Sequence, residues 1–157
     1  MRKPYYLLSI GILGIFPMVS AAPQFKDYPA SQYLGKNQPL KLSNESKKYR
    51  TLFKEISQQP PNFAGQYVLH VFGCGGGCSS ALAYNAKTGQ SFILGQTFGD
   101  CYSKTNGYTA NDIVFDLNSR LVIATGTRDG NQAHCEAVYY VADQDKFKEI
   151  ASRTIYP

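Results

Sequence analysis

Hydrophobic positions from residue 66 onward come in short runs that are separated by polar corners. Each run is rich in β-branched and aromatic residues and suits a β-strand by its length. The predicted strands span residues 66–72, 80–84, 91–94, 113–117, 121–125, 137–142 and 147–151. Corners at 85–89, 116–119 and 143–145 begin with Asn or Asp, whose side chains hydrogen-bond the backbone two residues on. The pattern predicts a mainly β (α+β) fold, an antiparallel meander of about seven strands.

One earlier stretch has the period of an amphipathic helix instead. Its apolar stripe, with the spacing i, i+3, i+4 and i+7, consists of Tyr49, Leu52, Phe53 and Ile56. Ser43 or Asn44 can cap the start of the helix, and the prolines at 60–61 end it. We therefore expect one N-terminal amphipathic helix that packs on the sheet.

The first residues have the features of a cleavable signal peptide. Arg2 and Lys3 supply positive charge, residues 5–16 are apolar, and small residues precede a cut after Ala21. The apolar stretch is shorter than the ~20 residues of a membrane-spanning helix, so we expect no stable membrane insertion after cleavage. The chain then divides into a signal peptide (1–21), an irregular segment interrupted by prolines (22–43) and a single mainly β domain (44–157). Its expected location is the periplasm or the outside of the cell.

Composition adds little to this picture. The formal net charge is +5, and the signal peptide carries two of the positive charges. The remaining basic residues are scattered, so we expect no nucleic-acid partner. The chain has 12 tyrosines and no tryptophan. Exposed tyrosines can serve protein contacts, but ordinary strand propensity explains their number equally simply.

The most unusual stretch, residues 72–80, places three consecutive glycines between two cysteines. Glycines permit a tight turn with backbone conformations that other residues avoid. The run is not a phosphate-binding loop, because no Lys-Ser/Thr pair follows it. We take this turn, with the histidine that precedes it, as a candidate functional turn. It consists of His70, Gly75, Gly76 and Gly77.

The four cysteines indicate two disulfides, because their number is even and the expected compartment is oxidising. Three pairings are possible, and we favour Cys74–Cys78 with Cys101–Cys135. The chain-entropy estimate is about 2 kcal/mol for the short loop and about 4 kcal/mol for the long one. The long bridge would stabilise the fold, and the short one would mainly fix the shape of the glycine turn.

Two other uses of the cysteines remain open. A metal set could be formed by His70, Cys74, Cys78 and His134. Zinc sites usually have closer ligand pairs, and strand alternation favours His70 as a hydrogen-bonded core residue. A catalytic thiol would need a free thiolate with a base within hydrogen-bonding reach. We therefore predict no catalytic residue, no metal and no cofactor.

Residues 127–132 form a polar stretch between two predicted strands. Arg128, Asp129 and Asn131 make it the best candidate for a partner loop, although a solvated hairpin end has the same composition.

Residues 61–67 (P-N-F-A-G-Q-Y), the later G-C-G-G-G-C turn and the N-A-K-T-G corner at 85–89 resemble a family of small exported bacterial proteins without a characterised activity. The match covers residues 49–94. Its motifs are P-N-F-A-G-x-Y, G-C-G-x-x-C and an Asp/Asn-x-x-T-G corner. The resemblance implies export, a β fold and pairing of Cys74 with Cys78. From the residues alone, Pro61 ends the helix, Phe63 fills the core and Gly65 allows the turn into the strand.

Size, compartment and disulfide content together resemble those of immunity proteins and lysozyme inhibitors. We therefore expect a non-enzymatic binding or inhibitory module that acts on another envelope or secreted protein. The alternatives are a thiol- or metal-dependent envelope enzyme that uses the Cys74/Cys78 turn, and a metal-binding envelope protein.

Overall fold

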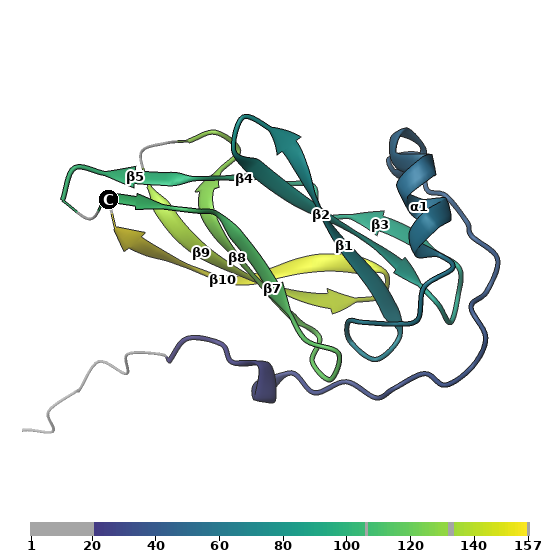
Figure 1. Ribbon diagram of the computed structural model, residues 1–157. Coiled ribbons are helices and arrows are strands. Elements are labelled where there is room, and N and C mark those ends of the chain that lie inside the picture. The colour runs from purple at the N-terminus through teal and green to yellow at the C-terminus, as the bar shows by residue number, and fades with distance from the viewer. Residues whose placement is uncertain (1–20, 106, 132–133, 157) are drawn as a thin grey trace, which may run out of the picture.

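The computed structural model describes residues 21–105, 107–131 and 134–156 (Figure 1). Residues 1–20, nearly all of the expected signal peptide, lie outside the described residues. Among the residues that are described, no helix is long and apolar enough to cross a membrane. The fold is mainly antiparallel β with one short α-helix, which confirms the predicted fold class.

From residue 21 onward, three helical elements precede the strands: η1 (Phe25–Asp27), η2 (Ser46–Tyr49) and α1 (Arg50–Ile56). The strands are β1 (Tyr67–Gly75), β2 (Cys78–Asn85), β3 (Ser91–Ile93), β4 (Phe98–Gly99), β5 (Cys101–Ser103), β6 (Gly107–Thr109), β7 (Asp112–Phe115), β8 (Leu121–Arg128), β9 (Cys135–Asp143) and β10 (Lys146–Tyr156). All seven predicted strands are present, as β1, β2, β3, β7, β8, β9 and β10, and the short strands β4, β5 and β6 were not predicted. These strands are only two or three residues long and show no hydrophobic alternation.

One large sheet has the order β1-β2-β4-β8-β9-β10, with β3 paired to β2 and β7 paired to β8. Strands β5 and β6 form a separate two-stranded hairpin. The very short β4 joins β2 to β8, so the sheet is not a simple meander. Its two halves enclose a shared core, to which strands on both sides of β4 contribute.

The central strands are apolar on both faces, because each face is covered. In β9, Val138 and Tyr140 enter the central core, whereas Tyr139 and Val141 face the other way. The helix covers the outer face of β1 and β2, and the N-terminal segment covers the outer face of β8 and β9. This coverage explains why the strands appear in the sequence as nearly continuous hydrophobic runs.

The predicted helix is confirmed, and α1 lies beside β1, β2 and β3 (Figure 1). Phe53 and Ile56, two residues of the predicted stripe, are fully buried against Val68 and Leu82. Ser43 Oγ accepts a hydrogen bond of 3.1 Å from the first backbone N–H of η2. The N-cap positions are Glu45 for η2 and Tyr49 for α1, so neither Ser43 nor Asn44 occupies one, although Ser43 satisfies this N–H.

Residues 22–43, which we call the strap, run along the outside of the body (Figure 1). The Tyr33 N–H donates to the Gly65 carbonyl at 2.8 Å, and the Lys41 N–H donates to the Gly89 carbonyl at 2.7 Å. Isolated bridges add contacts near residues 29 and 41. Apart from η1, the strap has no helix or strand of its own, so backbone bonds to the body hold it in place.

Candidate functional site

The molecule has two ends, which differ in their chemistry. The glycine turn, the β8–β9 loop and the β5–β6 hairpin lie at one end, which we call the clamp end. The P-N-F-A-G-x-Y segment lies at the other, together with the corners at 116–120 and 143–146. We call this the motif end. The candidate residues predicted from the sequence belong to the clamp-end half of the molecule, and none lies at the motif end.

The favoured disulfide pairing is confirmed. Cys74 is bonded to Cys78 with a Cα–Cα distance of 5.3 Å, and Cys101 is bonded to Cys135 with a Cα–Cα distance of 5.6 Å. We call the first the clamp and the second the staple. The clamp includes an exposed cysteine, Cys74, whereas both staple cysteines are buried. Because both clamp sulfurs are bonded, a thiol-based reaction would first require reduction of this disulfide.

The two histidines of the possible metal set lie apart from any cluster of ligands. His70 lies on β1, opposite Leu82 of β2, and is only half-buried. The expectation that it is a buried core residue is therefore wrong. His70 lies near the middle of β1, at the point where burial begins to decrease toward the clamp end. His134 is exposed. In the described ranges, no group of three or more His, Cys, Asp or Glu residues is arranged to hold a metal ion.

The glycine turn requires its glycines. Gly75, Gly76 and Gly77 have φ values of 90°, 61° and 75°, which side chains strongly disfavour. A Cβ on Gly77 would also lie 2.7 Å from Asp100 Oδ2. The turn therefore packs its backbone directly against a carboxylate.

Asp100 connects the glycine turn to the β5–β6 hairpin. Its Oδ1 accepts hydrogen bonds from the Asn111 N–H at 2.9 Å and from Asn111 Nδ2 at 2.6 Å. Its Oδ2 accepts a hydrogen bond from the Tyr108 hydroxyl at 2.8 Å. The bonds from Asn111 and Tyr108 lower the pKa of Asp100. Asn111 Nδ2 also donates to the Gly77 carbonyl at 2.9 Å, so the hairpin base and the turn are joined on both sides.

The β5–β6 hairpin presents two tyrosines that the sequence analysis did not single out. Tyr102 and Tyr108 lie directly opposite each other in the strand register. Their exposed fractions are 77% and 66%. The available signal was a pair of tyrosines on either side of a Ser-Lys-Thr-Asn-Gly turn. That signal is weak, because the flanking residues are not apolar.

The predicted partner loop meets the glycine turn, but its arginine is already engaged. Arg128 forms ion pairs with Glu136 at 2.9 Å and with Glu149 at 3.0 Å. Asp129 has a φ of 50°, and its Oδ1 accepts a hydrogen bond of 2.9 Å from the Thr97 N–H. The Asn131 N–H donates to the Arg128 carbonyl at 2.9 Å, which closes the loop.

A cleft of about 480 Å³ lies between the turn and this loop. It is lined by Gly76, Cys78, Thr97, Gly99, Asp100, Thr127, Asp129 and Gly130. The side chains of its two aspartates and two threonines all have internal hydrogen bonds. The glycine turn and the predicted partner loop therefore line the same cleft. The polar side chains of this cleft also hold the surrounding loops in place through hydrogen bonds.

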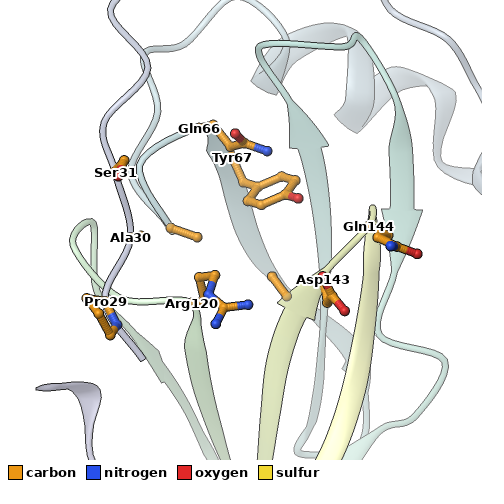
Figure 2. Close-up of a pocket in the computed structure, with 10 residues that line it drawn as sticks. Pro29, Ala30, Ser31, Gln66, Tyr67, Arg120, Asp143 and Gln144 are labelled. Atoms are coloured by element: carbon orange, nitrogen blue, oxygen red, sulfur yellow. The ribbon is translucent and has the colours of Figure 1, made fainter. Parts of the chain in front are cut away.

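A second cleft, of about 370 Å³, lies at the motif end (Figure 2). Ala64, Gln66 and Tyr67 of the P-N-F-A-G-x-Y segment line one side of it, and Arg120 and Asp143 line the other. Burial, followed by the charge of nearby Asp145, raises the pKa of Tyr67. This cleft was not predicted from the sequence, because its charged residues lie in corners that resemble ordinary turns.

The two clefts use their polar groups differently. At the clamp end those groups hold the loops together, whereas at the motif end the Arg120 and Asp143 side chains have no hydrogen-bond or ion-pair partner within the described part of the chain.

Comparison of the chain with models of protein families, with curated proteins and with solved structures finds no match.

Proposed function

We propose that the mature chain is an exported, non-enzymatic binding module that holds or inhibits another envelope or secreted protein. The observation that carries this proposal is the pair of exposed tyrosines, Tyr102 and Tyr108, on a hairpin at the clamp end. Tyrosine buries a large area with few rotatable bonds and is enriched at protein interfaces. The clamp end is therefore the proposed contact surface.

The hairpin that carries the tyrosines is attached to the body at several points. The staple joins Cys101, at the start of β5, to Cys135 at the start of β9. Asp100, just before β5, accepts bonds from Tyr108 on β6 and from Asn111 just after it, and the clamp fixes the adjacent glycine turn. A surface held in this way loses less conformational entropy on binding than a free loop would.

The charge of the clamp-end cleft favours a basic contact on the partner. Asp100 and Asp129 line this cleft, and no basic side chain of the described residues does. Arg128, the nearest basic residue in the loop, is directed to Glu136 and Glu149 instead. An acidic cleft beside two tyrosines suits an Arg or Lys side chain of the partner. Binding should accordingly weaken as salt concentration rises.

The proposed location is the periplasm or the outside of the cell, with signal-peptide cleavage after Ala21. Two disulfides in a small domain are typical of an oxidising compartment. Amino-terminal sequencing of the exported protein should begin at Ala22. Retention of residues 1–21 in the exported protein would contradict this proposal.

The binding proposal is tested by affinity capture with disulfide-bonded mature protein as bait. Envelope extract is passed over the wild type, over Tyr102→Ala and over the matched control Leu34→Ala. Leu34 is 92% exposed and lies in the strap, so its removal deletes an exposed apolar side chain away from the clamp end. We expect one stoichiometric partner, identified by mass spectrometry, that the wild type and the control recover equally.

Tyr102→Ala should reduce recovery of that partner about tenfold or more, as is typical of an aromatic hot spot. The purified pair is then examined by size-exclusion chromatography at low and high salt. Failure to recover a stoichiometric partner would sink the binding proposal. Equal recovery by Tyr102→Ala and the wild type would instead remove the clamp end as the contact surface.

A further inference from the structure

We infer that the cleft at the motif end binds a small zwitterion of amino-acid to dipeptide size, with Arg120 as the group that receives its carboxylate. This inference does not depend on the proposed partner binding, because the cleft lies at the opposite end of the strands from the clamp.

Arg120 is held firmly by its backbone, whereas its side chain is free. The Arg120 N–H donates to the Tyr28 carbonyl at 2.8 Å, and its carbonyl accepts from the Ala142 N–H at 2.9 Å. The residue is half-buried, and its guanidinium points into the space between Tyr67 and Asp143 (Figure 2). No acceptor for the guanidinium is present in residues 21–105, 107–131 and 134–156.

The Arg120 guanidinium lines the cleft and has no partner among the described residues, so a ligand can bind it without displacing another group. Arg128, near the other end of the same strand, shows the ordinary arrangement, with two carboxylates in contact. The planar guanidinium of Arg120 presents parallel N–H groups that match the two oxygens of a carboxylate. A ligand carboxylate is therefore the group that best completes this cleft.

The other lining groups select the rest of the ligand. Ser31, Gln66 and Gln144 come from the strap, the motif segment and the β9–β10 turn, and they offer hydrogen-bond donors and acceptors around the cleft. Asp143 lines the same cleft and forms no ion pair with any described residue. Its carboxylate favours a ligand with an ammonium group and disfavours a ligand with several negative charges. The volume of about 370 Å³ limits the ligand to a small molecule.

The backbone around this cleft adds an independent observation. Ala64 has a φ of 47°, and the consecutive residues Gln144 and Asp145 have φ values of 48° and 58°. Gln144 and Asp145 are the two central residues of the β9–β10 hairpin, where positive φ values are normal. Asp145 is held by Asn85 Nδ2 at 2.5 Å. Ala64 lies outside such a hairpin turn, and a positive φ there is uncommon for a residue with a side chain.

The test uses disulfide-bonded mature protein labelled with ¹⁵N and observed by NMR. The probe is L-alanyl-L-alanine, which carries both charges. N-acetyl-alanyl-alanine carries the carboxylate alone, and alanyl-alanine amide carries the ammonium alone. We expect saturable shifts of the Gln66, Tyr67 and Ala142 amide signals with the dipeptide, weaker binding of the acetylated form and no binding of the amide.

Arg120→Gln should weaken dipeptide binding about tenfold or more, since it removes a charge-assisted bidentate contact. Asp143→Asn should reduce dipeptide affinity to that of the acetylated form. The matched control is Arg50→Gln, which removes an exposed arginine from α1 and should bind like the wild type. The amide spectra of all variants verify the fold.

Two results would overturn the inference. One is the absence of saturable shifts for any probe at millimolar concentration. The other is unchanged dipeptide affinity in a folded Arg120→Gln variant. Equal affinity for the dipeptide and its acetylated form would show that the cleft receives a carboxylate without selecting a zwitterion, which contradicts the assigned role of Asp143.

Discussion

Gly65 should be the position at which the smallest substitution disturbs the largest part of the fold. It has a φ of 70°, and a Cβ at this position would lie 2.1 Å from the Ser31 carbonyl oxygen and 3.0 Å from the Gln32 Cα. These contacts are with backbone atoms of the strap, so no side-chain rotation can relieve them. Gly65→Ala must therefore either move the strap or shift the turn into β1.

The expected decrease in the free energy of unfolding has two parts. An alanine in the left-handed region costs roughly 1 kcal/mol. Displacement of the strap also weakens the bond from the Tyr33 N–H to the Gly65 carbonyl and the bond from the Gly65 N–H to the Leu117 carbonyl, each worth about 1 kcal/mol. We expect Gly65→Ala to lower the free energy of unfolding by about 3 kcal/mol, a large share of the total for a domain of this size.

Urea denaturation of the disulfide-bonded mature protein, followed by circular dichroism, measures this loss. Gly95→Ala is the matched control, because a Cβ there meets nothing within 4 Å and its φ is not positive. It should change the free energy of unfolding by less than about 0.5 kcal/mol. In a chain shortened by residues 22–34, Gly65→Ala should cost only the backbone part, about 1 kcal/mol. A loss no larger than that of Gly95→Ala, or the same loss with and without the strap, would refute the assigned contact.

Three further predictions concern the disulfides, the Ser43 hydroxyl before η2, and acid stability. Replacement of both staple cysteines by alanine should lower the free energy of unfolding in urea by about 4 kcal/mol, against about 2 kcal/mol for the clamp; equal losses would contradict the loop-length argument. Ser43→Ala should cost about 1 kcal/mol in the same assay, because it removes the acceptor for the first N–H of η2, whereas Asn44→Ala should cost less. Hydrogen bonds from Asn111 and Tyr108 lower the pKa of Asp100, so the folded state binds fewer protons there than the unfolded state. Its stabilisation is present at neutral pH and is lost as the pH falls through the lowered pKa, so the stability difference between wild type and Asp100→Asn should shrink below about pH 4 in urea titrations across pH.

The parts of the fold that could be predicted are those in which burial sets a period along the chain. The helix stripe from Tyr49 to Ile56 and the runs that became β1, β8 and β9 were recognised because whole faces of these elements are covered. Strands β4, β5 and β6 were not recognised, because none exceeds three residues and the β5–β6 hairpin is largely exposed. A strand held by a disulfide and a carboxylate needs no hydrophobic face of its own.

At the clamp end, the glycine turn and the 128–131 loop were predicted separately and proved to be neighbours. They meet because β4 pairs Cys78 with Gly99 and then Gly99 with Thr127. No local pattern predicts this contact, since it depends on a two-residue strand that joins both halves of the sheet. Asp100 follows Gly99 directly, so the same pairing of β4 places its carboxylate between the glycine turn and the β5–β6 hairpin.

The motif end could not be predicted, because Arg120 differs from Arg128 in having no ion-pair partner among the described residues, and this depends on strand register. Arg120 and Arg128 stand at the two ends of β8 and look alike in the sequence. The register places Glu136 opposite Gly126, two residues from Arg128, whereas the residue bonded to the Arg120 backbone is Ala142. One arginine is therefore neutralised by the fold, and the other is left facing a cleft. A shift of one residue in the β8–β9 pairing would turn the side chains of one strand to the opposite face of the sheet. The strand register therefore decides which arginine stays available to a ligand.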